Sequence, residues 1–134
     1  FRDYVYEITH DFDGPGEGIC KYLNEHGEPN DVVAIDYGDM PLKFYTKMRV
    51  VGGLTGENLE PAKNAKWVIL RKYSNCSKDI EVKRYLIQNI NFENYRRIVI
   101  DYPDTMNENR EYPGYHYFAT QKHEDRVVIY ERIN

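Results

Sequence analysis

Five side chains able to bind a polar ligand follow a short apolar run, Val-Val-Ala-Ile at positions 32–35. They are Asp36, Tyr37, Asp39, Lys43 and Tyr45. In an open α/β sheet, ligands and partners bind at the carboxyl ends of central strands. We therefore expect a ligand- or partner-binding site in this stretch. The competing interpretation is an ordinary strand-to-helix loop whose polar residues face water.

A second polar set follows another apolar run, Ile-Val-Ile at positions 98–100. Its members are Asp104, Glu108, Asn109, Arg110 and His116. In a doubly wound sheet the two strand ends can be neighbours, and Arg110 can then hold a carboxylate or phosphate with two parallel hydrogen bonds. Alternatively, Arg110 pairs with Asp104 or Asp39 and only ties the two loops together. We predict that the two loops meet at one end of the sheet.

The sequence contains no standard catalytic or nucleotide-binding motif. There is no G-x-G-x-x-G, G-x-x-x-x-G-K-[ST], G-x-S-x-G or H-E-x-x-H. The glycine-rich stretch at positions 14–18 precedes a predicted helix, but its spacing favours a helix-entry turn over a phosphate loop. The four histidines are scattered. We therefore expect no catalytic residue, no metal and no cofactor in this chain.

The apolar periodicity predicts the elements that position these side chains. A strand buried on both faces is expected at 32–35, with further strands at 3–9, 48–51, 67–70 and 97–101. A helix is expected after Pro15, with Ile19, Cys20, Tyr22 and Leu23 at helical spacing. A short helix at 41–47 is expected to carry Leu42, Phe44 and Tyr45 into the core. Ser77 should begin a helix at 78–89 whose buried stripe is Ile80, Leu86, Ile87 and Ile90.

Alternating patterns at 115–120 and 126–132 predict a C-terminal antiparallel hairpin. Residues 1–134 are thus expected to form a single α/β domain with layered, Rossmann-like architecture. We predict a mostly parallel sheet with helices packed on it. The predicted core lies in adjacent strands of this sheet and contains Val33, Ile35, Val68, Ile69, Val99 and Ile100.

The composition excludes some classes of partner. The net charge of −4 comes from 18 basic and 22 acidic residues that are mixed along the chain, which argues against nucleic acid. No apolar run reaches the roughly 20 residues that a membrane-spanning helix needs. Tyrosine is abundant, with 13 copies against 5 Phe and 1 Trp. Such residues suit half-buried surfaces against another domain or a membrane headgroup layer.

Several segments together resemble the soluble C-terminal domain of bacterial membrane glycosyltransferases. They are D-F-D-G-P, Y-G-D-M-P-L-K-F-Y-T, R-V-V-G-G-L, W-V-I-L-R, and E-N-R followed by His116. The resembling enzymes span the membrane many times, are related to protein O-mannosyltransferases and to the lipid A aminoarabinose transferase, and take a sugar from a polyprenyl-phosphate carrier. The similarity covers nearly the whole chain, from Asp11 to Ile133.

The resemblance implies a non-catalytic accessory domain, because the family's catalytic acidic residues lie in extracytoplasmic loops of the transmembrane part. It implies an extracytoplasmic location, with a tether to the membrane through a region that precedes Phe1. The implied partners are the transmembrane part of the same polypeptide, membrane headgroups, and the polyprenyl-phosphate sugar or its acceptor. The alternative is a free-standing α/β domain that binds a small sugar or a phosphorylated ligand.

Overall fold

The computed structural model describes residues 15–53, 58–72, 77–104 and 125–134. The strands predicted at 3–9 and 115–120 lie outside these described residues. The described elements form an α/β fold with an open, mixed sheet of five strands, in the order β2-β1-β3-β5-β4.

The sheet has a parallel half and an antiparallel half. β1 (Val32–Ile35) pairs in parallel with β2 (Arg49–Gly52) on one side and with β3 (Trp67–Ile69) on the other. β5 (Arg126–Arg132) lies between β3 and β4 (Tyr95–Pro103) and is antiparallel to both. β1, β2, β3 and β4 therefore share one direction, and β5 alone runs against them.

The prediction of a mostly parallel sheet with an edge hairpin needs correction. Two of the four pairings between described strands are antiparallel, and β5 is inserted into the sheet instead of extending its edge. The proposed hairpin partner of β5 at 115–120 lies outside the described residues. Alternation in residues 126–132 correctly predicted a strand, but the alternation of one strand does not determine which strands lie beside it.

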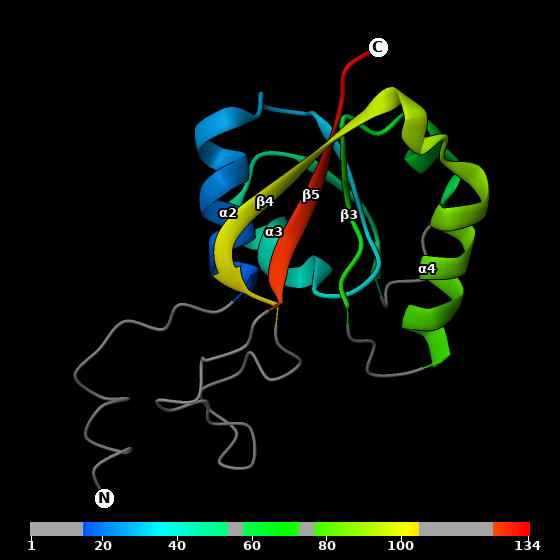
Figure 1. Ribbon diagram of the computed structural model, residues 1–134, viewed down its shortest axis with the longest axis horizontal. Coiled ribbons are helices and arrows are strands. Elements are labelled where there is room, and N and C mark those ends of the chain that lie inside the picture. Colours follow the sequence, from blue (N-terminus) through cyan, green and yellow to red (C-terminus); the bar gives the residue numbers. More distant parts are fainter. Residues whose placement is uncertain (1–14, 54–57, 73–76, 105–124) are drawn as a thin grey trace, which may run out of the picture.

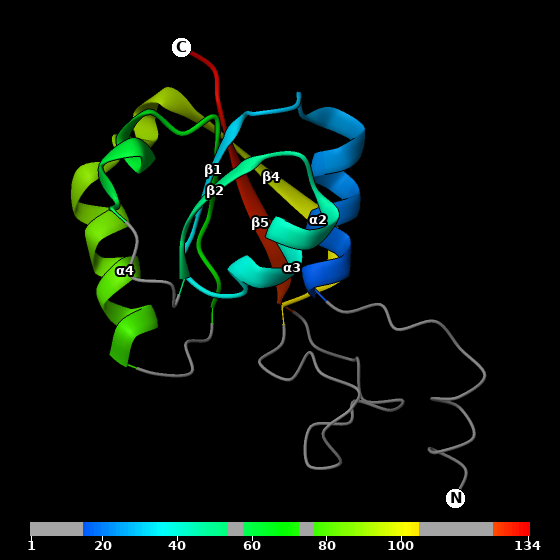
Figure 2. The same cartoon turned by 180° about the vertical axis from the view of Figure 1, so that it is seen from behind.

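Helices cover both faces of the sheet (Figure 1). α2 (Pro15–His26) and α3 (Asp39–Tyr45) lie on one face, while α4 (Ser77–Asn89) and the 3-10 turn η2 (Glu60–Asn64) lie on the other. The view from behind shows the same arrangement, with the strands between the two helical layers (Figure 2). A second short 3-10 turn, η3 (Phe92–Asn94), leads into β4.

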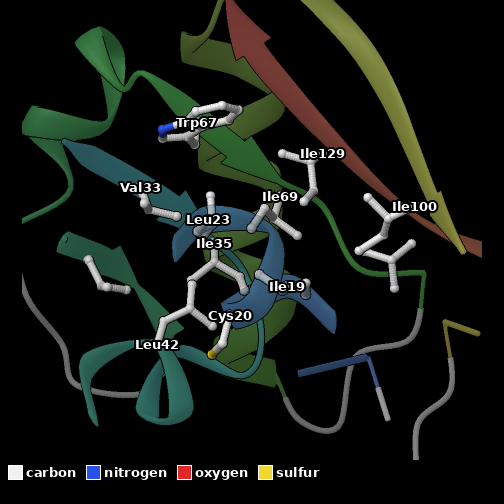
Figure 3. Packing of buried hydrophobic residues seen from close by; sticks show 12 residues of the cluster. Ile19, Cys20, Leu23, Val33, Ile35, Leu42, Trp67, Ile69, Ile100 and Ile129 are labelled. Carbon is white, nitrogen blue, oxygen red and sulfur yellow. The ribbon is translucent and has the colours of Figure 1, made fainter. Parts of the chain in front are cut away.

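Two apolar clusters fill the spaces on either side of the sheet. Val33, Ile35 and Ile69 face the α2 side, where they meet Leu23 and Leu42 (Figure 3). Their neighbours in β1 and β3 point the other way and pack under α4 and η2; they are Ala34 and Val68. This two-sided burial explains why both strands are continuous apolar runs in the sequence.

α2 confirms the helix predicted after Pro15. Ile19, Cys20 and Leu23 are buried at helical spacing, and the helix ends at His26. The amide of Gly27 still donates to the carbonyl of Leu23 over 2.8 Å, which satisfies one of the acceptors at the end of the helix.

The predicted buried faces of α3 and α4 are partly wrong. In α3, Leu42 is buried, but Phe44 and Tyr45 are 78% and 74% exposed. This helix has only seven residues, and Leu42 is its one fully buried apolar side chain. Phe44 follows Leu42 by two positions and so points to another side of the helix, whereas Tyr45 is the last residue of α3.

In α4 the buried stripe is displaced by one or two positions from the predicted one. Val82 and Leu86 are buried together with Ile90 just past the helix end, whereas Ile80 and Ile87 are about half exposed. The prediction is therefore right for Leu86 and Ile90 and wrong for Ile80 and Ile87. Positions 82, 86 and 90 repeat at four-residue spacing and so lie along one side of the helix.

Val99 is the one predicted core residue that the structure leaves half exposed. Ile100 packs on the α2 side of the sheet, and Val99 points to the opposite face. α4 packs over β1 on that face, and β4 lies at the far edge of the sheet. The α4 side of β4 therefore stays accessible at Val99.

Candidate functional site

The order of the strands makes the carboxyl ends of β1 and β3 the candidate position for a ligand-binding crevice. These strands are neighbours, but β1 leads into α3 on one face and β3 leads to α4 on the other. Connections that depart to opposite faces leave space between adjacent strand ends, which is where open α/β sheets bind ligands. Asp36 follows β1 directly, and Arg71 lies two residues after β3.

Arg71 joins the ends of three strands. Its backbone N–H donates to Asp36 Oδ1 over 2.9 Å, and its Nε donates to Asp104 Oδ1 over 2.9 Å. The backbone N–H of Lys72 donates to the other oxygen of Asp104 over 3.0 Å. We call Asp36, Arg71 and Asp104 the carboxyl-end clasp. All three charged side chains of this clasp are almost fully buried, with exposed fractions of 3% or less.

The electrostatics of Asp36 differ from those of an ordinary surface carboxylate. Burial raises the pKa of Asp36 from 3.8 to about 6, because loss of hydration disfavours the charged form. The hydrogen bond from the Arg71 amide and the charges of Lys83 and Arg71 oppose this shift. Near pH 7 the carboxylate is therefore mostly ionised, but protonation lies within a mildly acidic range.

Two glycines shape the loop between β1 and α3 and the loop after β2. Gly38 precedes α3 with φ 89°, and Gly53 has φ 71°; both are backbone conformations that side chains disfavour. A Cβ on Gly53 would lie 2.1 Å from Cγ of Asp39. The chain after β2 can therefore cross closely over Asp39, the buried first residue of α3.

The residues predicted from the first polar set divide into buried and exposed groups. Asp36 and Asp39 are buried, and Lys43 pairs with Asp39 at 3.2 Å. The ring of Tyr37 lies near the Arg71 guanidinium, with Cζ 5.3 Å from the ring centroid. Tyr45 is exposed and contributes its backbone carbonyl to Asn24 Nδ2 over 2.9 Å. Tyr45 therefore belongs to the surface of α3 and not to the clasp.

In the second polar set, only Asp104 lies among the described residues. Glu108, Asn109, Arg110 and His116 fall outside them. Asp104 and Asp36 bond the same arginine, so the points where the two polar loops leave the sheet do lie together. Among the described residues, Arg71 is the one that ties these strand ends together, and the roles considered for Arg110 stay predictions.

A groove of about 460 Å³ lies beside the clasp, on the α4 side of the sheet. Its basic residues are Arg71, Lys72, Lys83, Arg97 and Arg126. Its other lining residues are Leu70, Val99, Asp104, Asp125 and Val128. The clasp residues Arg71 and Asp104 thus form part of its wall. We call this feature the basic groove.

The floor of the basic groove comes from the antiparallel half of the sheet. Val99 of β4 lies opposite Val128 of β5. Arg97, two residues before Val99 in β4, lies opposite Tyr130 of β5. The register shifts between Val99 and Pro103, so β4 is irregular at the groove. Such bulges change the direction of side chains and are frequent beside binding sites.

The site residues predicted from the sequence do not include Arg71, Lys83, Arg97 or Arg126. For Arg71 a signal was present, since it follows the buried run at 67–70 and therefore lies at a strand's carboxyl end. Arg97 and Val99 also share one face by their spacing of two. Nothing in the sequence indicated that Lys83 and Arg126 lie on the same groove. Lys83 belongs to α4 and Arg126 to β5, and the pairing of strands in the sheet decides where β5 lies.

No helix within residues 15–53, 58–72, 77–104 and 125–134 combines the length and apolar character needed to cross a membrane. No cluster of three or more His, Cys, Asp or Glu side chains in these ranges has the arrangement of a metal site.

Comparison with known proteins assigns this chain to no family. The chain matches no protein-family model, no curated protein and no solved structure.

Proposed function

We propose that this chain is the extracytoplasmic accessory domain of a membrane glycosyltransferase that uses a polyprenyl-phosphate sugar. Its role in this proposal is to bind and position, and the bond-making residues belong to the transmembrane part. The Rossmann-like classification is part of the same proposal, and the strand order β2-β1-β3 with helices on both faces supports it.

The supporting observation is that three of the resembling segments converge at one end of the sheet. Gly53, in R-V-V-G-G-L, packs closely against Asp39, in Y-G-D-M-P-L-K-F-Y-T. Arg71 ends W-V-I-L-R, and its amide donates to Asp36 immediately before Y-G-D. These separate segments thus build a single structural unit, which supports interpreting them as parts of one family pattern.

The bonding of the clasp favours a binding role over catalysis. Asp104 accepts hydrogen bonds on both carboxylate oxygens, from Arg71 and from the Lys72 amide. Both oxygens of this carboxylate therefore take part in holding the end of β3 against the end of β4. The clasp is therefore suited to holding strand ends in place beside a ligand.

The exposed face of α3 offers the contact surface that an accessory domain requires. Met40, Phe44 and Tyr45 are all at least half exposed, and the rings of Phe44 and Tyr45 lie 6.5 Å apart between centroids. Large exposed apolar side chains that lie together are typical of protein or membrane contact surfaces. In the proposal, this α3 surface contacts the transmembrane part or the headgroup layer beside it.

The test uses the full reading frame that contains this chain, expressed in membranes. We expect membrane-spanning segments in that frame and transfer of sugar from a polyprenyl-phosphate donor. Replacing Phe44 and Tyr45 together by Ser should lower transfer by about tenfold, because exposed aromatic residues are common hot spots of contact surfaces. The melting temperature of the 134-residue chain should remain nearly unchanged.

The matched control is Ile87→Ser, which also removes a half-exposed apolar side chain but from α4. It should leave transfer at the level of the unmodified protein. A reading frame without membrane-spanning segments would contradict the proposal, and so would full transfer after deletion of this domain.

The basic groove favours one second candidate, a free-standing domain that binds a phosphorylated ligand. Five cationic side chains on one groove suit such a ligand in either setting. The reading frame distinguishes the two candidates, since a free-standing domain would not be joined to membrane spans.

A further inference from the structure

The described lining of the basic groove is rich in cations, unlike the chain as a whole. The chain carries a net charge of −4, whereas the described residues that line the groove include five cationic side chains and two carboxylates. The cations are contributed by the end of β3, by α4, by β4 and by β5. Tertiary folding therefore concentrates positive charge that is dispersed in the sequence.

Part of this positive charge is already compensated within the groove. Arg71 pairs with Asp104 at 2.9 Å, and Lys72 pairs with Asp125. These two pairs account for both carboxylates of the lining. The other cations of the described lining are Lys83, Arg97 and Arg126.

These three cations have different partners. Lys83 Nζ donates to the carbonyl of Arg71 over 2.6 Å, and its charge also acts on the buried carboxylate of Asp36. Arg126 Nε lies 3.4 Å from Asp101, whose side chain is 97% exposed, so water screens this pair. For Arg97, no carboxylate partner occurs among the described residues.

The floor between the cations is apolar. Val99 and Val128 face each other across β4 and β5, and Leu70 adjoins them from the end of β3. A volume of about 460 Å³ is within the range of small-molecule sites. The groove can therefore contact both a charged group and an uncharged part of the same ligand.

We infer that the basic groove is a binding site for a phosphate-bearing anion, held by Lys83, Arg97 and Arg126. Arginine presents forked N–H groups that match phosphate oxygens, and lysine adds a point charge. Several cations on one groove suit a phosphate or diphosphate group, which carries more negative charge than a single carboxylate. The uncharged part of the ligand lies against Val99 and Val128.

The phosphate group can come from a water-soluble phosphate ester or from a lipid headgroup at a membrane surface. Both share the chemistry that the groove recognises. Binding to the groove does not require that the chain belong to a glycosyltransferase, so the two proposals can fail separately.

The experiment uses the 134-residue chain and two probes. Inorganic pyrophosphate is titrated by calorimetry, and vesicles of phosphatidylglycerol are compared with vesicles of phosphatidylcholine by co-sedimentation. We expect binding of at least one anionic probe, weakened by salt because the contacts are electrostatic. Arg97→Gln should weaken it by about tenfold, the effect of losing one charge-assisted hydrogen bond of about 1.5 kcal/mol.

The matched control is Arg49→Gln, which removes an exposed arginine from the start of β2, far along the sheet from the groove. It should leave the affinity unchanged. Lys83→Gln should act like Arg97→Gln, and the thermal unfolding of each variant is measured alongside. If Lys83→Gln unfolds the chain, Arg97→Gln and Arg126→Gln decide the result.

Pyrophosphate binding that Arg97→Gln weakens would identify a soluble phosphate ester as the ligand class. Selective binding to phosphatidylglycerol that the same variant weakens would identify a lipid headgroup. The inference is overturned if neither probe binds at millimolar concentration, or if Arg49→Gln weakens binding as much as Arg97→Gln does. Sugar transfer by the full-length protein is a separate readout, and its loss or retention bears only on the proposed function.

Discussion

Arg71 Nε donates to Asp104 Oδ1 over 2.9 Å and so connects the end of β3 with the end of β4, two strands that β5 separates. Both side chains are buried, with exposed fractions of 1% and 3%. The start of β5 lies at the same place, because the Asp104 amide donates to the carbonyl of Asp125 over 3.0 Å. The ion pair therefore fixes the place where the antiparallel strand enters the sheet, and it also forms one wall of the basic groove.

Removing the arginine of the clasp should destabilise the fold strongly. Arg71→Met keeps much of the side-chain volume and the amide that donates to Asp36, but it leaves the buried carboxylate of Asp104 without its cation. Breaking a buried ion pair by removing one partner costs about 3–5 kcal/mol of unfolding free energy. Chemical denaturation should show this loss, whereas the exposed Arg49→Met should stay within about 0.5 kcal/mol of the unmodified chain.

A double variant makes the interpretation of this result specific. In the Arg71→Met background, the further change Asp104→Asn removes an uncompensated carboxylate and should cost less than it does alone. The difference between the loss of unfolding free energy in the double variant and the sum of the losses in the two single variants measures the coupling of Arg71 and Asp104. Strictly additive effects would mean that Arg71 and Asp104 do not depend on each other.

Asp36 should make stability depend on pH in the mildly acidic range. Its pKa of about 6 in the folded state lies above the ordinary value of 3.8, so the folded chain binds more protons than the unfolded chain between these values. The contribution of this group to stability therefore falls as the pH rises from 3.8 to about 6. Asp36→Asn should flatten the pH dependence of the unfolding free energy in this window.

The control for Asp36 is Asp101→Asn, a change at a carboxylate that is 97% exposed. Unfolding curves recorded at several pH values should give the same pH dependence for this variant and for the unmodified chain. An unchanged slope for Asp36→Asn would show that the group is not the source of the effect.

Core truncations should separate the buried strand from the exposed strand position. Ile69→Ala removes a fully buried side chain from β3 and should cost about 2–5 kcal/mol of unfolding free energy. Val99→Ala removes methyl groups that are half exposed on the groove floor and should cost less than about 1 kcal/mol. Denaturant titrations of both variants test this ranking, and equal losses would contradict the placement of β4 at the sheet edge.

Local sequence was sufficient for most elements. The continuous apolar runs at 32–35 and 67–70 predicted strands buried on both faces, and both are confirmed as β1 and β3. Helical spacing predicted α2, and a polar start followed by spaced apolar residues predicted α4. These features depend on neighbours within a few residues, and such patterns can be read from one sequence.

The buried faces of short or mixed-pattern helices were harder to predict. Phe44 and Tyr45 are apolar enough for a core, yet only Leu42 of α3 has a partner surface in the sheet layer. In α4, Ile80 and Ile87 are likewise half exposed while Val82 is buried, because the surface on which a helix packs sets the orientation of that helix. Apolar character alone gives the tendency to be buried, and the neighbouring elements decide which side chain achieves it.

The sequence predicted a site that includes Asp36 and Asp104, and a binding role for these residues stays a prediction. The structure shows that both carboxylates bond to Arg71. The sequence could not show that Arg71 would be their common partner, because these residues are separated by 35 and 33 positions. It could not place Lys83 and Arg126 on one groove either, since that depends on β5 pairing between β3 and β4. Strand insertion is a non-local choice among alternative pairings of similar strands, and only the tertiary packing of the whole sheet decides it.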